Sequence, residues 1–451
     1  MGRLTGIWRS WSARRRALVA VGIVLLAVGV GALAYGNLKR PPDVFDPAAQ
    51  FVVEEEPKPD RKKPKDRTTE WPTYGYNDAR TRFFPSFSVR PPFGSSDWSI
   101  QFGKLLEFSP IVVDDRIYVM DIDARFYAVD AGRGKIIWER RIGSLNATSP
   151  AYAQGRLYAT NLEPGQAVAL RARDGKVLWK KALPGRSESS PLIFRDELVI
   201  FGCECGTVFA LDAKDGSIEW EVKTSGAIKA ALALDDGTVY GGNYAGEAFA
   251  IDAATGREEW RTTTSGGSFG RGGGIYSTPA VAYGRVYFGS IDSRVYSLDQ
   301  ESGNIAWSHS TGAEVYSGPA VADTPGTPPT VYIGSADDNF YALDANDGSV
   351  RWQRDTGGDI TGAGSVIGDV AYVSVIGKDI GTLGFNVRTG DKVFEHELGE
   401  YNPAITDGER LFLTGYSELR AFPPKSLQKI RDKREAERRK ARKEKQEAPA
   451  P

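Results

Sequence analysis

The chain has 451 residues, a formal net charge of −1, 51 glycines and 11% aromatic residues. The balanced charge gives no overall field that would attract nucleic acid, so no nucleic-acid partner is predicted. Two Cys, two His and two Met argue against a haem, a copper centre or a Cys/His zinc site, and exclude a disulfide-framework fold. The many glycines and aromatic residues favour strands and turns over long helices.

The N-terminus has the pattern of a membrane anchor. Residues 1–16 carry five arginines and no acidic residue, and an uncharged apolar run follows. Residues 17–37 are therefore predicted to span the cell membrane once as a signal-anchor helix, since a span needs roughly 20 apolar residues. The upstream arginines predict a cytoplasmic N-terminus and an extracytoplasmic remainder. A cleaved signal peptide, with an A-x-A site at residues 32–34, is the alternative.

Two charged segments flank the rest of the chain. Residues 38–70 are rich in proline and charged residues, which predicts an extended, solvated linker long enough to hold a domain tens of ångströms from the membrane. Residues 425–451 carry eleven Lys/Arg against five Asp/Glu. This tail is predicted to be disordered or helical and solvated, with contact to anionic lipid or an acidic partner as the alternative.

Between these segments, one phrase returns at a regular interval. It reads FYAVDAGRGKIIW at 126–138 and FYALDANDGSVRW at 340–352. The tryptophan positions, followed by Phe394 in a degenerate unit, are separated by 40, 41, 41, 40, 47, 45 and 42 residues. A period in the forties with about four short strands per unit predicts a β-propeller. The repeat tryptophans are Trp98, Trp138, Trp179, Trp220, Trp260, Trp307 and Trp352.

The phrase has a structural explanation. Its Asp and Gly bracket a turn between the last two strands, where an Asp side chain can bond backbone N–H groups and Gly supplies a positive φ. The Trp is predicted to pack between neighbouring sheets. The repeated carboxylates are therefore assigned to turns and not to catalysis; they are Asp130, Asp212, Asp252, Asp299 and Asp344.

The ends of the array predict how the ring closes. No complete unit precedes Trp98, and the strands near 409–415 and 418–422 have no Trp strand after them. If the strand around Trp98 completes the last blade, no sheet edge is left exposed. The sequence thus predicts an all-β, eight-bladed propeller over residues 71–424.

The repeat, with its S-P first strands and Y-A-L-D-A-x-x-G-x-x-x-W phrase, resembles that of the pyrroloquinoline-quinone (PQQ) propeller superfamily. The segment WPTYGYNDARTRFFP at 71–85 resembles the start of such propellers. The superfamily contains quinoprotein dehydrogenases, which bind PQQ and calcium, and cofactor-free scaffolds of the outer-membrane protein assembly type. Fold alone does not choose between these branches.

Several features favour the scaffold branch. The dehydrogenase branch implies adjacent cysteines against the cofactor, whereas this chain has Cys203 and Cys205 separated by Glu204. These cysteines are interpreted as a possible redox pair, either a local disulfide or two free thiols, with a metal pair as a further alternative. The Gly-rich stretch at 265–274 lacks the residues of a phosphate loop. His309 and His396 have no evident catalytic partner, so no catalytic residue and no metal site are assigned.

The loops that lead into each first strand should gather around the central channel. At one repeat position they carry residues of different types, unlike the turn positions, which suits a surface for a protein, a peptide or a polar ligand. These candidate channel-mouth residues are Glu107, Glu188, Lys229, Tyr276, Tyr316, Thr361 and Glu400.

The sequence therefore predicts a membrane-anchored scaffold that binds a protein or peptide near the membrane, with no cofactor. A PQQ-dependent oxidoreductase with calcium in the channel is the alternative.

Overall fold

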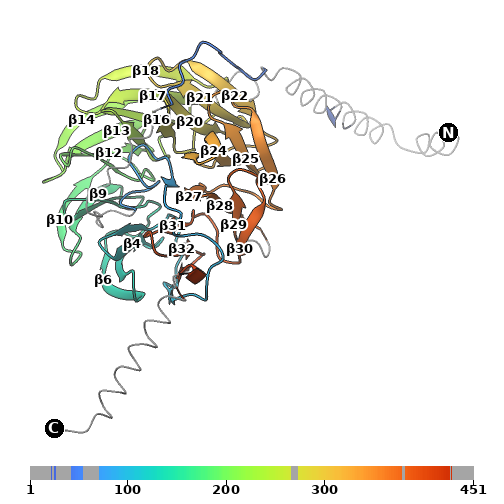
Figure 1. Ribbon diagram of the computed structural model, residues 1–451. Helices are drawn as coiled ribbons and strands as arrows, with labels where there is room; N and C mark the ends of the chain where they lie inside the picture. Colours follow the sequence, from blue (N-terminus) through green and yellow to red (C-terminus); the bar gives the residue numbers. More distant parts are fainter. Residues whose placement is uncertain are drawn as a thin grey trace, which may run out of the picture.

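The computed structural model describes residues 22, 25–26, 42–53, 71–265, 273–377, 381–426 and 428. These residues form the predicted ring of eight blades, each a meander of four antiparallel strands (Figure 1). The basic segment 1–16, nearly all of the predicted span 17–37, most of the Gly-rich loop and most of the 425–451 tail lie outside the described residues. In the part that is described, no helix has the length and apolarity to cross a membrane.

The blades follow one another along the chain. Blade 1 has β3 (Ile111–Val113), β4 (Arg116–Met120), β5 (Arg125–Asp130) and β6 (Lys135–Arg141); blade 2 has β7 (Ala151–Ala153), β8 (Arg156–Asn161), β9 (Gln166–Arg171) and β10 (Val177–Ala182). Blade 3 has β11 (Leu192–Phe194), β12 (Leu198–Cys203), β13 (Thr207–Asp212) and β14 (Ile218–Lys223); blade 4 has β15 (Ala233–Asp235), β16 (Thr238–Gly242), β17 (Glu247–Asp252) and β18 (Glu258–Thr263).

The second half of the ring repeats this plan. Blade 5 has β19 (Ala280–Ala282), β20 (Arg285–Ser290), β21 (Arg294–Asp299) and β22 (Ile305–Ser310); blade 6 has β23 (Ala320–Thr324), β24 (Thr327–Gly334), β25 (Asn339–Asp344) and β26 (Val350–Asp355). Blade 7 has β27 (Ser365–Ile367), β28 (Val370–Ser374), β29 (Thr382–Asn386) and β30 (Lys392–His396), with β1 (Phe83–Phe84) added in parallel to β27. Blade 8 has β31 (Ile405–Thr406), β32 (Leu411–Thr414), β33 (Glu418–Phe422) and β2 (Trp98–Gln101).

The predicted closure is confirmed. Strand β2 pairs antiparallel with β33, with Trp98 opposite Ala421 and Gln101 opposite Glu418. The last blade is therefore completed by a strand from the start of the propeller. The edge of β33, which would otherwise be unpaired where the ring closes, is covered by β2, and this removes a site for edge-to-edge aggregation.

The repeated phrase stabilises what we call the blade junctions, where the repeat Trp of one blade meets the next blade. All seven tryptophans donate an indole N–H to a backbone carbonyl of the following blade at 2.9–3.1 Å; the acceptors are Ala131, Ala172, Ala213, Ala253, Gln300, Ala345 and Val387. Within the turns, the repeated Asp accepts backbone N–H groups, as Asp130 does from Arg133 at 2.8 Å and Asp252 from Thr255 at 2.8 Å. The turn role predicted for these carboxylates is confirmed.

The Gly of the phrase has a second role that the sequence did not reveal. A Cβ on this Gly would lie 2.5–2.8 Å from the Trp ring of the preceding blade at all seven junctions. At Gly348, for example, φ is +74° and the ring is that of the fully buried Trp307. Gly is needed here both for its backbone conformation and because the ring leaves no room for a side chain.

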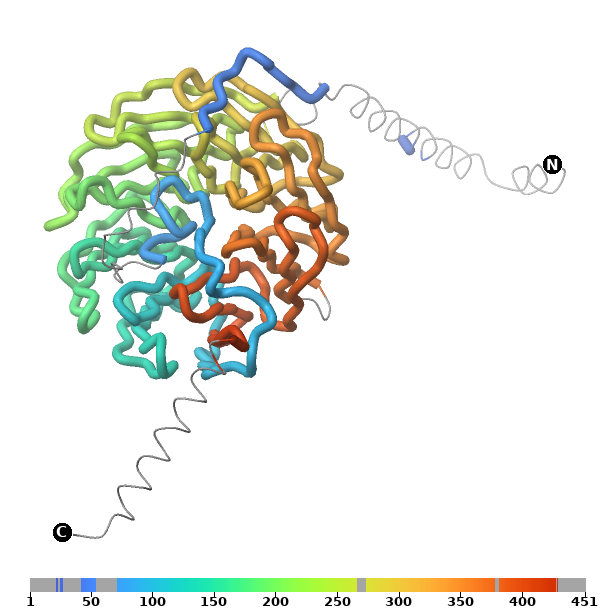
Figure 2. Tube along the Cα trace, viewed as in Figure 1, coloured from blue at the N-terminus to red at the C-terminus, as the bar shows by residue number. Residues whose placement is uncertain are grey.

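An inner segment, residues 71–86, runs around the inside of the ring (Figure 2). Its backbone bonds the first strands of blades 1, 2, 4, 5, 6 and 7, from Trp71 with Val112 in blade 1 to Arg82 with Val366 in blade 7. Two of its side chains, Arg80 and Arg82, are fully buried. The Arg80 guanidinium donates to the carbonyls of Pro191 and Leu232, and that of Arg82 to the carbonyl of Pro319. The segment therefore joins blades that are distant in the sequence.

The structure revises the linker predicted over residues 38–70. Its described part, residues 42–53, is not free in solvent but lies against the side of blade 5 as a strap (Figure 2). The Val44 and Asp46 N–H groups donate to β22, at 2.9 Å to the Ser308 hydroxyl and 2.7 Å to the Ala306 carbonyl. Further along, Phe51 packs against Tyr283 with ring centroids 5.6 Å apart. The linker was predicted from its overall content of proline and charged residues, whereas the contacts with blade 5 are made by the short apolar stretch VFDPAAQFVV at residues 44–53.

Candidate functional site: the channel mouth

Strand direction defines the two faces of the ring. In each meander, the loop that leads to the first strand and the turn between the second and third strands lie on one face, which we call the mouth face. The Asp–Gly turns of the junctions lie on the other face. The predicted candidate residues precede the first strands, so they gather at the mouth face around the channel.

A single cavity of about 280 Å³, the mouth pocket, collects most of these residues. Its polar and aromatic lining consists of Tyr74, Glu107, Phe108, Ser109, Lys229, Tyr276, Thr278, Tyr316, Thr361, Tyr401 and Asn402. Five of the predicted residues are in this lining: Glu107, Lys229, Tyr276, Tyr316 and Thr361. Glu188 is not in the lining but contacts it, whereas Glu400 is not part of the pocket and its neighbour Tyr401 takes the place.

Lys229 is held between carboxylates. Its ammonium lies 2.8 Å from Glu188 Oε1 and 3.4 Å from Glu204 Oε1, and 5.8 Å from the centre of the Tyr244 ring. Burial alone would lower the pKa of Lys229, but the hydrogen bond and charge of Glu188 with the charge of Glu204 raise it above its usual value. Lys229 therefore stays a cation at neutral pH.

The two carboxylates nearest the pocket are partly desolvated. Burial raises the pKa of Glu188, and its neighbour Glu204 adds to the rise while Lys229 opposes it. Burial also raises the pKa of Glu107, with Glu188 adding to the rise. The charge of Lys229 opposes this rise, but within the described residues no hydrogen bond or ion pair engages the Glu107 carboxylate. Glu107 is thus a half-buried carboxylate without a partner, which costs free energy when it is ionised.

Aromatic rings form much of the wall. Tyr276 stands edge to face with both Tyr244 and Tyr316, at centroid distances of 6.1 and 6.2 Å. The Tyr276 hydroxyl donates to Glu188 Oε2 at 3.2 Å, and burial with the charge of that carboxylate raises the pKa of Tyr276. On another side of the pocket, the ring centroids of Tyr74 and Phe108 lie 6.1 Å apart. The pocket therefore combines aromatic faces with carboxylate oxygens.

The sequence did not identify every residue of this site. Tyr74 comes from the inner segment and Glu204 from the turn between β12 and β13, neither of which shares the repeat position used for the prediction. Phe108 and Tyr401 are next to predicted residues in the same loops, so the adjacent repeat position would have found them. Only the folded ring reveals that the β12–β13 turn reaches Lys229.

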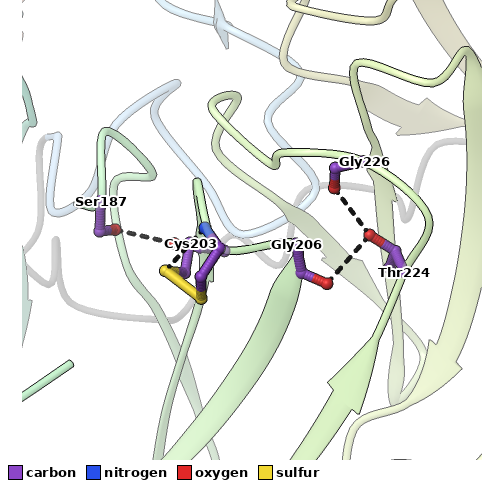
Figure 3. Close-up of a disulfide and its surroundings, with 7 residues drawn as sticks. Ser187, Cys203, Gly206, Thr224 and Gly226 are labelled. Carbon is purple, nitrogen blue, oxygen red and sulfur yellow. Dashed lines mark hydrogen bonds between the residues drawn. A yellow bond between two sulfur atoms is a disulfide. The ribbon is translucent and has the colours of Figure 1, made fainter. Parts of the chain in front are cut away.

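The same turn carries the two cysteines. Cys203 and Cys205 form a disulfide with their Cα atoms 5.0 Å apart, a distance that a turn permits. Figure 3 shows it beside Ser187, whose hydroxyl donates to the Gly202 carbonyl at 2.7 Å. Cys203 is fully buried and Cys205 is exposed. Of the alternatives, the structure contains the disulfide; a redox role stays a prediction.

Neither histidine belongs to the site. His309 lies on β22 against Tyr341, and His396 lies on β30 with its ring between Phe394 and Phe422. Across the described ranges, no three His, Cys, Asp or Glu side chains converge where they could hold a metal ion.

Comparisons with known proteins agree with this architecture. The family model described as outer membrane protein assembly factor BamB matches residues 88–230 and 204–426. No curated protein sequence matches the chain. The crystal structure of BamB from Moraxella catarrhalis is similar in fold, with a TM-score of 0.62, 20% identity, and coverage of 73% of this chain and 99% of that one.

Quinoprotein structures share the fold as well. Quinohemoprotein alcohol dehydrogenase from Comamonas testosteroni gives a TM-score of 0.65 at 15% identity and covers 79% of this chain and 81% of its own. A europium-containing methanol dehydrogenase gives 0.64 at 16% identity, covering 80% and 98%. The predicted resemblance to PQQ-type propellers is confirmed, and because the matching model covers most of the ring, the chain belongs to the family of outer membrane protein assembly factor BamB.

Proposed function

We propose that this chain is a membrane-anchored, extracytoplasmic scaffold that binds other proteins through the mouth face of its propeller. One observation carries the proposal. Positions at the blade junctions repeat the same residue types, whereas the equivalent positions at the mouth differ from blade to blade and combine into one pocket. Recognition requires such differences, because a partner must meet a specific arrangement of charges and rings.

The family supports a role in assembly. Its description names an outer membrane protein assembly factor, and we carry over to this chain the general part of that role, which is protein binding. The proposed anchor at residues 17–37 would confine the propeller to the membrane surface and raise its effective concentration for partners there.

Site-specific photo-crosslinking tests the scaffold. A photoreactive amino acid is placed at Thr361 in the mouth pocket and, as a matched control, at the exposed Ile137 on the outer strand β6. We expect a discrete crosslinked protein from position 361 and none from position 137 in intact cells. Absence of a crosslink at 361, or the same bands from both positions, would contradict docking at the mouth.

Membrane fractionation tests the anchor. The full chain should stay with the membranes after alkaline extraction, because a spanning helix is held by the bilayer core. A chain that begins at residue 38 and is exported by a foreign cleavable signal should be recovered in the soluble fraction. Release of the full chain by alkali would contradict the anchor and favour a cleaved signal peptide.

The second candidate is a PQQ-dependent oxidoreductase, which the fold similarity to quinoprotein dehydrogenases favours. The residues of the mouth do not fit this cofactor. PQQ carries three carboxylates, and at the mouth Lys229 is already paired with Glu188 and Glu204 while Glu107 adds a further negative charge. Calorimetric titration with PQQ and calcium is the test. We expect no saturable heat, and saturable, calcium-dependent binding would place the oxidoreductase first.

A further inference from the structure

Carboxylates outnumber ammonium groups at the mouth pocket. Glu107 is in its lining, and Glu188 and Glu204 lie against Lys229 at its edge. Among the described residues, Lys229 is the cation that lowers the pKa of Glu107. The buried Arg80 guanidinium and the Nη1 atom of Arg82 donate to backbone carbonyls, whereas the Nε and Nη2 atoms of Arg82 have no hydrogen-bond partner among the described residues. Neither arginine is among the groups that shift the pKa of Glu107. A positive charge entering the pocket would therefore be attracted.

Lys229 shows how the protein itself stabilises a cation at this place. Its ammonium is bonded to a half-buried carboxylate, lies near a second one and faces the Tyr244 ring. A ring face and a carboxylate together favour an ammonium or guanidinium group, since the ring quadrupole and the negative charge both attract it.

The other side of the pocket also combines a carboxylate with aromatic rings, of which Tyr74 already faces the buried guanidinium groups of Arg80 and Arg82, with their Cζ atoms 5.9 and 5.2 Å from the ring centre. Glu107 is partly desolvated and unpaired among the described residues, and the rings of Tyr276, Tyr316, Phe108 and Tyr74 line the same cavity. The cavity volume of about 280 Å³ suits one side chain and not a large cofactor. An unpaired half-buried carboxylate destabilises the fold, so a binding role would explain its presence.

We propose that the mouth pocket binds a lysine or arginine side chain of a partner protein, with Glu107 pairing with the cation and the tyrosine rings surrounding its stem. The proposal rests on the scaffold function and names the chemistry of its partner. Charge complementarity selects this occupant over acidic or purely apolar segments, because an acidic group would meet Glu107 and Glu188 and an apolar one would leave Glu107 desolvated and unpaired.

The test is calorimetric titration of the purified full chain with four glycine-flanked pentapeptides that differ in the central residue: lysine, arginine, glutamate or norleucine. We expect the lysine and arginine peptides to bind and the other two not to bind. Affinity should fall as salt rises, because part of the attraction is screened. It should also fall as the pH drops through the raised pKa values of Glu107 and Glu188, since the protonated carboxyls no longer attract a cation; Lys229, Glu204 and Tyr276 are the other titratable groups that face them.

Two variants assign the binding to the pocket. Glu107→Gln should weaken the lysine peptide by at least about 10-fold without lowering the melting temperature, and Tyr316→Leu should weaken it by a smaller factor. The control is Glu219→Gln, which removes an exposed carboxylate on the outer strand β14 and should change nothing. Equal loss in Glu107→Gln and Glu219→Gln, or equal binding of the lysine and norleucine peptides, would overturn the proposal.

The outcomes separate this inference from the scaffold itself. A crosslink at Thr361 without any binding of basic peptides would overturn the cation site and leave the scaffold standing. Basic-peptide binding that needs Glu107, without a crosslink at Thr361, would support the cation site and contradict docking of a protein at the mouth.

Discussion

The blade junctions and the mouth are built from the same repeats, yet they follow opposite rules. At seven of the eight contacts between blades a Trp donates to a carbonyl of the next blade and a Gly lies against its ring, whereas blade 7 has Phe394 at the Trp position. At the mouth, the equivalent position is Glu in blade 1, Lys in blade 4 and Tyr in blades 5 and 6. Repetition marks the contacts that every blade needs for packing. Variation marks the positions where packing does not require one residue type, so that the residue can be selected for binding.

Removal of the closing strand should give the largest effect. A chain that begins at residue 105 lacks β2 and the inner segment, so blade 8 loses its outer strand and the first strands lose their bonds to residues 71–86. We expect no cooperative thermal unfolding of this chain by circular dichroism. A stable, monomeric protein with the β-sheet signal of the full propeller would contradict the closure as the basis of the ring.

A matched pair of glycine substitutions separates packing at the junction from backbone strain. Gly348→Ala places a Cβ 2.7 Å from the Trp307 ring at a φ of +74°, whereas Gly237→Ala has a φ of +80° and nothing within 4 Å. Strain alone costs roughly 1–2 kcal/mol, and overpacking adds about 1–3 kcal/mol. Denaturant unfolding should therefore show a larger loss of stability for Gly348→Ala. Equal losses of stability would mean that the Trp307 side chain can move aside and that its close contact with Gly348 does not restrict the residue at this position.

Loss of the disulfide should affect the mouth more than the fold. Cys203 and Cys205 are two residues apart, so their bond constrains the unfolded chain little. The double variant Cys203→Ser/Cys205→Ser should lose no more than about 2 kcal/mol of its free energy of unfolding.

In the same variant, the pKa of Lys229 should fall toward its ordinary value, because Glu204 between the cysteines helps to raise it. Carbon-13 NMR of the lysine side chains measures this. Glu204→Gln is the control that should shift the pKa in the same direction. An unchanged pKa, or a loss of stability as large as that of a junction variant, would place the turn outside the mouth.

The smallest expected effect is a gain of stability at the mouth. Burial raises the folded-state pKa of Glu107 above its unfolded value. The folded state therefore holds the proton more tightly, and stability falls as the pH rises through the interval between the two pKa values. Glu107→Gln removes this loss, so its melting temperature should lie slightly above that of the wild type at about pH 8 and match it below the unfolded pKa of about 4.3. A lower melting temperature at about pH 8 would show that the carboxylate stabilises the fold.

Much of the architecture was predictable because it repeats. The Trp period gave the eight blades, and the incomplete units at both ends gave the pairing of β2 with β33. The candidate residues of the mouth followed from one repeat position, and five of the seven line the pocket. Glu400 does not line the pocket, whereas its neighbour Tyr401 does.

What escaped prediction lies outside the repeat. Tyr74 reaches the pocket because the inner segment runs through the channel, and Glu204 reaches Lys229 because two turns on the same face meet. Neither contact follows from a period, since each joins residues at different repeat positions. The strap at 42–53 was missed for a similar reason. The composition of the whole segment 38–70 is dominated by charged residues and proline, and it hides a short stretch with Phe45 and Phe51 that packs on blade 5.

If the proposed anchor is present, the strap would limit how far the ring can lie from the membrane. If the proposed anchor ends at residue 37, four residues, 38–41, separate it from the docked part of the chain, which begins at residue 42. The Cα atoms of residues 37 and 42 could then be at most about 18 Å apart. The strap begins where Asp43 contacts Ser310 and Arg294. These residues lie at the end of β22 and the start of β21, next to the mouth face. A connection this short, attached at that edge, would keep the mouth face within reach of the lipid surface.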